Sequence, residues 1–412
     1  MQSMIRQFLH AAMFVSSMMS AHAASVGAVS NCNRFDMAVP DRGSGATSFT
    51  WATQPEVNTS PLAPYRIGLW GDSLTSAPNF IDAALAASNI PKTSVLPSFI
   101  QAGIKVPGLS LPVRVSCASN GWQMAYAYKE KSNIPGYSKG MVSMRSDTPG
   151  DTVFLDFRAP LASTRVQALT VLYEKARPDS SLLLGVSIDG GNEKLVSLSR
   201  LSSTTLEIKP ESPMSTVRLR LVSGQVTLHG FAPRYQETPA VILDTMSVPS
   251  SVLRSWANVA ERFFSAPASP NPEYNLILVE YGTNEGASPD FDSQRYRTYL
   301  RTNLARLREF YPRARCVLIG PPDRGTLNAS SATGAMKYAN VHHQIAAAQQ
   351  QVGQEFHCSF WDWQLAMGGP GAAPRWLKMN PPQMQPDMTH LTATGYAASG
   401  RMFGTSFPLN KN

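Results

Sequence analysis

The sequence predicts an α/β protein that carries an inserted antiparallel β-sandwich. Near both ends of the chain, apolar runs of strand length alternate with helix-length segments, which indicates a parallel sheet with helices on both faces. In the middle, short segments of alternating polarity favour an antiparallel sandwich. With 412 residues, the chain is long enough to form two hydrophobic cores.

The N-terminal segment predicts export. Residues 1–23 combine a positive charge, a modest apolar stretch and Ala21-His22-Ala23, which fits an A-x-A cleavage site. We therefore expect a periplasmic or secreted protein cleaved near Ala23; an amphipathic helix is the alternative. Residues 24–64 are rich in Ser, Pro, Asn and Thr and predict an irregular lead-in. No later segment has the length of a membrane span, so no integral membrane segment is expected after cleavage.

The first segment of the α/β domain is predicted at residues 65–95, where the apolar strand IGLW meets GDSL and helix-compatible residues follow. Residues 96–235 differ, because short strand-like segments there are separated by turn residues. We interpret them as the inserted sandwich. Its six predicted strands are Thr152–Ala159, Arg165–Tyr173, Ser181–Asp189, Lys194–Arg200, Thr204–Ile208 and Thr216–Phe231.

Strand and helix patterns alternate again over residues 236–412, which complete the domain begun at 65–95. A long helix is predicted between two of its strands, because apolar residues recur every three or four positions. A second helix is expected over residues 336–351. The recurring residues are Tyr296, Leu300, Leu304 and Leu307. The predicted strands are Val241–Asp244, Asn275–Gly282, Cys316–Asp323 and Phe356–Trp363.

The composition is that of a folded, basic protein. Apolar residues make up 43% and charged residues 16%, which argues against disorder. The formal net charge of +8 favours anionic surfaces or polymers as partners. No block of consecutive basic residues occurs, so a nucleic-acid partner is not expected.

Four cysteines remain after the predicted cleavage, and an even number in an oxidising compartment suggests two disulfides. Three pairings are possible. We favour Cys316–Cys358 and Cys32–Cys117, because each pair then falls within one region of the chain. The spacing matches no zinc pattern, so no metal is expected.

Ser73, in Gly-Asp-Ser-Leu after the first strand, is a candidate nucleophile. A serine at a strand-to-helix junction is also a preferred helix cap, and on the tetrapeptide alone this ordinary interpretation is favoured. A nucleophilic serine needs a base, and the base needs an orienting acid.

His390 is the candidate base, because Asp387 precedes it by three residues in QPDMTHLTATGY. That spacing on one turn brings both side chains to the same side. The carboxylate can then hold Nδ1–H and leave Nε2 for Ser73. The alternative is an ordinary helix start capped by Thr392.

Asn284, in the YGTNEG segment after an apolar strand, is a candidate oxyanion donor. Ligands of parallel sheets bind at the carboxyl ends of the strands, where a Gly-rich turn would present its amide. A plain turn is the alternative, since Gly and Asn favour turns in any case.

The order GDS, GTNE and DMTH resembles the SGNH, or GDSL, hydrolase superfamily, whose blocks read GDS, a glycine block, GxND/E and DxxH. The resemblance implies a flavodoxin-like three-layer domain with Ser73 as nucleophile, His390 as base and Asp387 as its partner. It also implies an oxyanion hole formed by the backbone N–H of Ser73 and the side chain of Asn284. The glycine block is imperfect, because serines occupy the turn; Ser250 is the first choice for its donor. These serines are Ser247, Ser250 and Ser251.

Within the superfamily, the chain is similar to periplasmic peptidoglycan O-acetylesterases, which carry an inserted sandwich like a carbohydrate-binding module. GPPD (Gly320–Asp323) and FWDWQLAMGG (Phe360–Gly369) also resemble that subfamily. The resemblance implies removal of O-acetyl groups from muramic acid through an acetyl-serine, with no cofactor. Three tryptophans are candidates to line the substrate groove, with burial in the core as the alternative: Trp361, Trp363 and Trp376.

Three other functions stay open at this point. The enzyme could act on another acetylated polysaccharide, or transfer acetyl groups with the same triad. A sugar-binding protein without activity is the alternative from another class.

Overall fold

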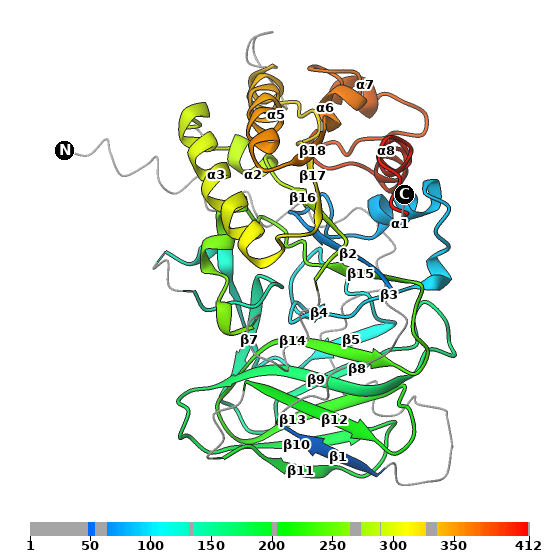
Figure 1. The fold of residues 1–412 in the computed structure, drawn as a ribbon, viewed down its shortest axis with the longest axis vertical. Helices are drawn as coiled ribbons and strands as arrows, with labels where there is room; N and C mark the ends of the chain where they lie inside the picture. The colour runs from blue at the N-terminus through cyan, green and yellow to red at the C-terminus, as the bar shows by residue number, and fades with distance from the viewer. Residues whose placement is uncertain are drawn as a thin grey trace, which may run out of the picture.

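The computed structural model describes residues 48–53, 64–131, 135–199, 204–263, 273–288, 290–326 and 336–410. The predicted leader at residues 1–23 lies outside these ranges. Helices and a parallel sheet fill the upper half of Figure 1, and antiparallel strands fill the lower half. Within the described ranges, no helix combines the length and apolar character needed to cross a membrane.

The upper half is built on a six-stranded parallel sheet, in which the strand order is β18-β17-β16-β2-β15-β3. The four strands predicted for residues 236–412 all belong to it. Its strands are β2 (Tyr65–Trp70), β3 (Val95–Leu96), β15 (Val241–Thr245), β16 (Leu276–Glu280), β17 (Arg315–Ile319) and β18 (Cys358–Trp361).

Helices cover both faces of this sheet, because its strands alternate buried side chains between two cores. Ile277 and Val279 of β16 pack in one core with α3 and α5, whereas Leu276 and Leu278 pack in the other with α1 and α8. Both predicted long helices are present. The helices are α1 (Asn79–Ala87), α2 (Thr283–Gly286), α3 (Ser293–Phe310), α5 (Lys337–Glu355), α6 (Trp363–Ala366), α7 (Ala373–Leu377) and α8 (Ala393–Ser406).

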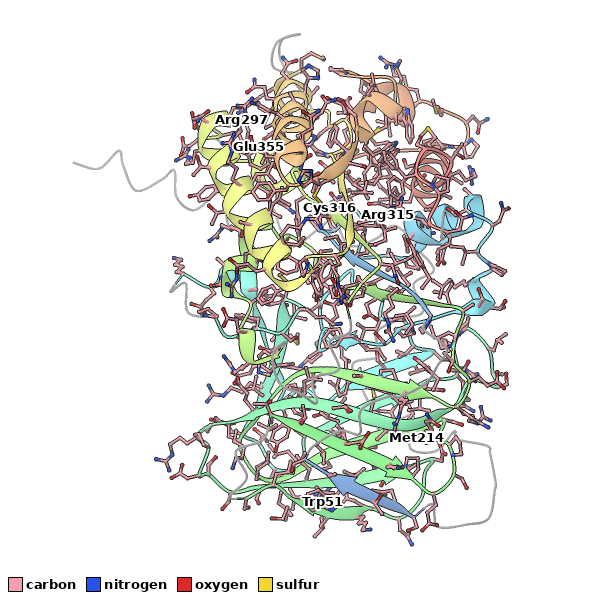
Figure 2. The ribbon with its side chains drawn as sticks, in the orientation of Figure 1. Trp51, Met214, Arg297, Arg315, Cys316 and Glu355 are labelled. Atoms are coloured by element: carbon pink, nitrogen blue, oxygen red, sulfur yellow. A yellow bond between two sulfur atoms is a disulfide. The ribbon has the colours of Figure 1, made fainter. Side chains whose placement is uncertain are left out.

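Helices α3 and α5 are joined side by side by polar contacts as well as by their apolar faces. Arg301 of α3 forms an ion pair with Glu355 of α5 at 2.7 Å, and Arg297 donates to Gln351 at 3.2 Å. Figure 2 shows Arg297 and Glu355 on these neighbouring helices.

The predicted Cys316–Cys358 disulfide is confirmed. The two cysteines lie opposite each other on the paired strands β17 and β18. The bond therefore links the outer strand of the sheet to its neighbour. Cys32, the predicted partner of Cys117, lies outside the described residues.

Two antiparallel sheets are formed by the strands between β3 and β15 together with β1, which precedes β2 in the chain. One has seven strands in the order β1-β12-β9-β14-β7-β6, with β4 paired to β14; the other has five in the order β11-β10-β13-β8-β5. Side chains from both sheets share one core. The strands are β4 (Ile100–Gln101), β5 (Val115–Ala118), β6 (Gln123–Tyr126), β7 (Val142–Ser146), β8 (Thr152–Asp156), β9 (Val166–Lys175), β10 (Leu182–Ile188), β11 (Lys194–Ser197), β12 (Thr205–Pro210), β13 (Thr216–Gly224) and β14 (Val226–Tyr235).

Two predictions about this region are wrong. The lead-in is not irregular throughout, because Phe49–Ala52 forms β1 and pairs with β12. The single strand predicted at Thr216–Phe231 is two strands in different sheets. The chain turns between them at Gly224, whose φ of +96° favours glycine.

A buried ion pair connects the antiparallel region to the parallel sheet. Lys139 Nζ lies 3.3 Å from Asp244 Oδ2 on β15, and both side chains are almost inaccessible. Asp244 also accepts hydrogen bonds from the backbone N–H groups of Ser98 and Phe99 and from the Tyr274 hydroxyl. The Asp244 carboxylate therefore has several hydrogen-bond donors and holds segments that are distant in sequence against β15.

Replacing Asp244 with alanine is expected to lower the free energy of unfolding by about 3–5 kcal/mol, because it leaves the Lys139 ammonium buried without a counterion. The exposed Lys92–Asp82 pair offers the matched control, and Asp82→Ala should cost less than about 1 kcal/mol. Urea unfolding followed by tryptophan fluorescence measures the free energy of unfolding of both variants. The buried Trp70 reports on this region because its indole N–H donates to the Lys139 carbonyl. Equal losses in the two variants would contradict this role of Asp244.

Candidate active site

Ser73 lies on a turn and is not a helix cap. Strand β2 ends at Trp70, and helix α1 begins only at Asn79. The residue that precedes α1 is Pro78, and no side chain caps the helix. The capping interpretation of Ser73 is therefore wrong, and its half-buried hydroxyl is available for other contacts.

The structure brings the hydroxyl of Ser73 to the imidazole of His390, although 317 residues separate them. Ser73 Oγ lies 3.0 Å from His390 Nε2, and His390 Nδ1 lies 2.7 Å from Asp387 Oδ2. The other carboxylate oxygen accepts from the backbone N–H groups of Thr389 and His390 at 2.9 and 3.0 Å. The Asp387 side chain is thus held by its own turn and aligned on the ring.

Helix α8 begins immediately after this turn. Thr392 caps it by accepting from the N–H of Gly395, as the alternative interpretation of the motif required. Capping and the His390–Asp387 contact therefore coexist in this segment, because different residues make them.

The contact between His390 and Asp387 lowers the pKa of Asp387 and raises that of His390. Burial alone would raise the pKa of Asp387, but hydrogen bonds from His390 and from Thr389 lower it to about 2. The hydrogen bond to Asp387 raises the pKa of His390 above its usual 6.5, and the nearby Asp72 acts in the same direction. Asp387 is consequently ionised at neutral pH and stabilises a protonated His390.

The side chain of Asn284 connects the serine turn to the second predicted block. Asn284 lies in the short helix α2, directly after β16. Its Nδ2 donates to Asp72 Oδ2 at 3.0 Å and to the carbonyl oxygen of Ser251 at 2.9 Å. Three segments far apart in sequence therefore meet at one amide.

Ser250 adopts the left-handed conformation, with φ of +67°. This region of backbone space favours glycine, the residue that the second block was expected to carry. Ser251 N–H closes the turn by donating to Val248 O at 2.9 Å. Ser250 is exposed at the tip of this turn, next to the carbonyl that holds Asn284.

Sequence reasoning missed a buried carboxyl group behind the serine turn. Glu280, the last residue of β16, is fully buried and accepts from the N–H of Asp72 at 3.1 Å and from Thr75 Oγ1 at 3.2 Å. A Cβ on Gly71 would lie 2.7 Å from the Glu280 carboxyl oxygen, which explains the glycine at this position. The only signal in the sequence is a charged residue at the end of an apolar strand.

Three carboxyl groups are crowded together here, and burial raises the pKa of each. The pKa of Asp72 is raised to about 6 and that of Glu285 to about 7. The pKa of Glu280 is raised well above its usual value by burial and by the neighbouring Asp72. Both causes favour the neutral form of the Glu280 carboxyl group.

The three tryptophans do not line a groove. Trp363 is fully buried and Trp361 and Trp376 are 6% exposed, all in the core beneath α1 and α8. Trp361 and Trp363 pack against Phe80 of α1. The alternative interpretation, core aromatics, is correct because their rings fill the space between helices and sheet.

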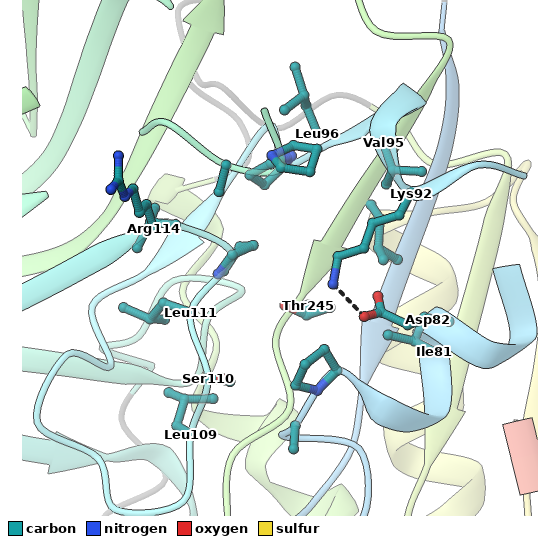
Figure 3. A pocket seen from close by; sticks show the side chains of 18 of the residues that line it. Ile81, Asp82, Lys92, Val95, Leu96, Leu109, Ser110, Leu111, Arg114 and Thr245 are labelled. Carbon is teal, nitrogen blue, oxygen red and sulfur yellow. Dashed lines mark hydrogen bonds and ion pairs between the residues drawn. The ribbon is translucent and has the colours of Figure 1, made fainter. Parts of the chain in front are cut away.

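A cavity of about 300 Å³ lies beside α1, between that helix and residues 109–116. Figure 3 shows it with the Lys92–Asp82 ion pair at its edge. Its lining includes Ser76 but none of Ser73, Asp387 and His390. The cavity and the three side chains are therefore distinct features.

Comparison with known proteins gives a family match and a fold match. Residues 221–398 match the model of the GDSL-like lipase/acylhydrolase family. This segment contains Asn284, Asp387 and His390. Ser73 lies outside it in sequence, but the folded chain places its hydroxyl next to His390. No curated protein matches the chain.

Among solved structures, one titled "Peptidoglycan O-acetylesterase in action, 5 min" matches with a TM-score of 0.62 and 19% identity, over 83% of this chain and 90% of that chain. A carbohydrate esterase family 2 enzyme with a carbohydrate-binding domain, from Corynascus thermopiles (Myceliophthora fergusii), has a TM-score of 0.30 and 13% identity, over 69% and 98% of the two chains. A lipase/acylhydrolase from Enterococcus faecalis has a TM-score of 0.30 and 16% identity, over 41% and 76%. The first likeness shows a shared fold.

Proposed function

We propose that the chain, a carboxylic ester hydrolase whose residues 221–398 match the model of the GDSL-like lipase/acylhydrolase family, removes O-acetyl groups from peptidoglycan. Ser73 is the nucleophile, His390 the base and Asp387 the acid that orients it. One observation carries the proposal: the unbroken relay from Ser73 Oγ through His390 to Asp387.

The proposed reaction has two halves. The oxygen of Ser73 attacks the acetyl carbonyl carbon while its proton passes to His390 Nε2. The tetrahedral intermediate collapses as His390 protonates the sugar oxygen, which leaves as an alcohol. Water then attacks acetyl-Ser73, gives a proton to His390 and releases acetate, and that proton returns to the serine.

Asn284 and backbone N–H groups are the proposed oxyanion donors. In the free protein both Nδ2 hydrogens are shared with Asp72 and with the Ser251 carbonyl, which holds the amide in one orientation. To donate to the oxyanion, the amide has to share or release one of these two hydrogen bonds, while the other keeps it in position. The N–H groups of Ser73 and Ser250 complete the proposed hole.

Replacing Asn284 with alanine is expected to lower kcat for p-nitrophenyl acetate by about 10²–10³-fold, because one donor to the oxyanion is lost. KM should change little, since the donor acts mainly in the transition state. The exposed Asn340→Ala variant on α5 is the control and should keep wild-type kcat. A kcat within about threefold of wild type for Asn284→Ala, well short of the loss expected for an oxyanion donor, would exclude the amide from the hole.

The choice of peptidoglycan is supported by the fold shared with an enzyme named for that substrate. The net charge of +8 suits an anionic wall polymer. The Cys316–Cys358 disulfide is consistent with an oxidising, extracytoplasmic location, which we also propose.

We also propose that residues 96–235 form an inserted sandwich domain with a role like that of a carbohydrate-binding module. Support comes from the shared core of the two antiparallel sheets and from their position between β3 and β15. By its pairing with β12, strand β1 joins this proposed domain.

Acetate release from purified polymers tests the proposed function. The wild-type enzyme should release acetate from O-acetylated peptidoglycan, with none from the same material after removal of its acetyl groups. Acetylated xylan, at equal ester concentration, should be a poorer substrate. Preference for xylan would indicate another polysaccharide, and acetyl transfer to a sugar acceptor without net acetate would indicate a transferase.

A further inference from the structure

We propose that Arg324, with Tyr338 beneath it, forms a carboxylate-binding subsite next to the Ser73–His390–Asp387 relay. The proposal rests on the proposed function, because the carboxylate it takes is that of the muramoyl unit. The subsite would recognise the lactyl group of muramic acid, a contact that hydrolysis of the acetyl ester does not itself require.

The backbone around Arg324 is fixed against the relay. Asp323 is fully buried and accepts from Gln364 Nε2 at 2.7 Å and from the N–H of Ala373 at 2.8 Å. On the other side, the N–H of Gly325 donates to the carbonyl of Met388 at 3.0 Å. Met388 lies between Asp387 and His390 in the chain, so the residue after Arg324 is hydrogen-bonded to the turn that carries both.

The guanidinium of Arg324 is held in place but not satisfied. Its central carbon lies 4.1 Å from the centre of the Tyr338 ring. Its Nε is buried without a hydrogen-bond partner, and none of the ion pairs among the described residues involves Arg324. Two positions along the same loop, Thr326 Oγ1 is also buried without a partner. Arg324 Nε and Thr326 Oγ1 are covered by protein atoms, so a ligand would reach this half-buried side chain at its outer guanidinium nitrogens, for which the described residues supply no acceptor.

Asp387 is not the missing counterion. Its two carboxylate oxygens already accept from the His390 ring and from the N–H groups of Thr389 and His390. The charge of Arg324 interacts with both His390 and Asp387. The hydrogen bond to Asp387 raises the pKa of His390, whereas Arg324 acts to lower it. Burial lowers the pKa of Arg324 itself, and Asp387 acts to raise it. An unneutralised Arg324 thus opposes the imidazolium that forms during the reaction, and a substrate anion would remove that opposition.

A carboxylate fits this group better than other parts of the proposed substrate. Guanidinium presents parallel N–H donors that match the two oxygens of a carboxylate, and stacking on an aromatic ring orients the plane. Muramic acid differs from the other sugar of the wall by its lactyl group, which ends in a carboxyl or continues into an acidic peptide. The subsite would therefore distinguish muramoyl units from glucosaminyl ones.

The test measures inhibition of p-nitrophenyl acetate hydrolysis by N-acetylmuramic acid and by its methyl ester, which lacks the negative charge. In wild-type enzyme the acid should inhibit with a KI roughly tenfold or more below that of the ester, as expected for a charge-assisted hydrogen bond. Arg324→Gln should bring the two KI values together. The exposed Arg401→Gln variant on α8, which also removes one positive charge, should keep the wild-type ratio.

Three results would overturn the subsite. They are equal KI values for acid and ester in the wild type, no inhibition by the acid, and a ratio that Arg324→Gln leaves unchanged. An equal fall of the ratio in Arg401→Gln would assign the effect to overall charge instead. Inhibition of p-nitrophenyl acetate hydrolysis is measured independently of acetate release from peptidoglycan. A failure to release acetate from peptidoglycan would therefore refute the proposed function without refuting the subsite.

Discussion

Replacing Ser73 with alanine is expected to reduce kcat for p-nitrophenyl acetate by roughly 10⁶-fold, the scale seen when a triad nucleophile is removed. Ser73 Oγ is the one hydroxyl within hydrogen-bond reach of His390 Nε2 in the described part of the chain. Without it, the imidazole has no nucleophile to activate and only binding and oxyanion stabilisation remain. Steady-state kinetics at high enzyme concentration measures the residual rate.

The exposed serine Ser359 on β18 provides the control, since Ser359→Ala removes a hydroxyl far from the relay in sequence and should keep wild-type kcat. Both variants should unfold at the wild-type temperature, because Ser73 is only half-buried and Ser359 is exposed. A Ser73→Ala enzyme that retains more than about a tenth of wild-type kcat would show that another group attacks the ester.

Asp387→Asn is expected to lower kcat by about 10⁴-fold, because an amide NH₂ facing Nδ1 favours the wrong tautomer of His390. The pH dependence should change as well. Catalysis needs neutral His390, so wild-type kcat/KM should fall as the pH drops through a pKa above 6.5, which the Asp387 hydrogen bond raises. Removing the carboxylate removes that cause, and the acid limb of the profile should move to lower pH.

Profiles of kcat/KM against pH for the wild type and Asp387→Asn test both parts, with the exposed Asp147→Asn variant as control. The control should reproduce the wild-type limb. An acid limb that stays at the wild-type pH in Asp387→Asn would mean that another group titrates. A small loss of kcat would mean that the acid does not fix the tautomer.

The parts of the fold that follow from local pattern were predicted well. The strands of the parallel sheet are apolar on both faces, as in LILVE of β16, and stand out as short continuous runs. The Asp387–His390 spacing is a property of one turn. The Cys316–Cys358 pair lies on adjacent strands that are consecutive β17 and β18 in the chain, which is why regional proximity identified it.

The errors arise where contacts between distant segments decide the structure. β1 exists because it pairs with β12, more than a hundred residues later, and nothing in FTWA itself requires a strand. The prediction that tryptophans line a groove failed for the same reason, because a sequence does not show which other segments cover an aromatic ring. Trp363 is buried because α8 covers it, with Ser399 accepting its Nε1–H.

The surroundings of the relay were missed for the same reason. Glu280 contacts the serine turn although the two are 208 positions apart, and Arg324 is placed near the His390 turn by the hydrogen bond from its neighbour Gly325 to Met388. Neither belongs to a motif. The sequence identifies the groups that perform the proposed chemistry. The groups that position them and shift their pKa values come together only in the folded chain.

Trapping of the acyl-enzyme tests the central claim most directly. Enzyme mixed with excess p-nitrophenyl acetate is quenched in acid within its first turnovers, digested and mapped by mass spectrometry. The account predicts one acetyl group on the peptide that contains Ser73, and none there in His390→Ala. An acetyl group on any other residue, or steady turnover with an unmodified Ser73 peptide under conditions where deacylation is slow, would contradict it.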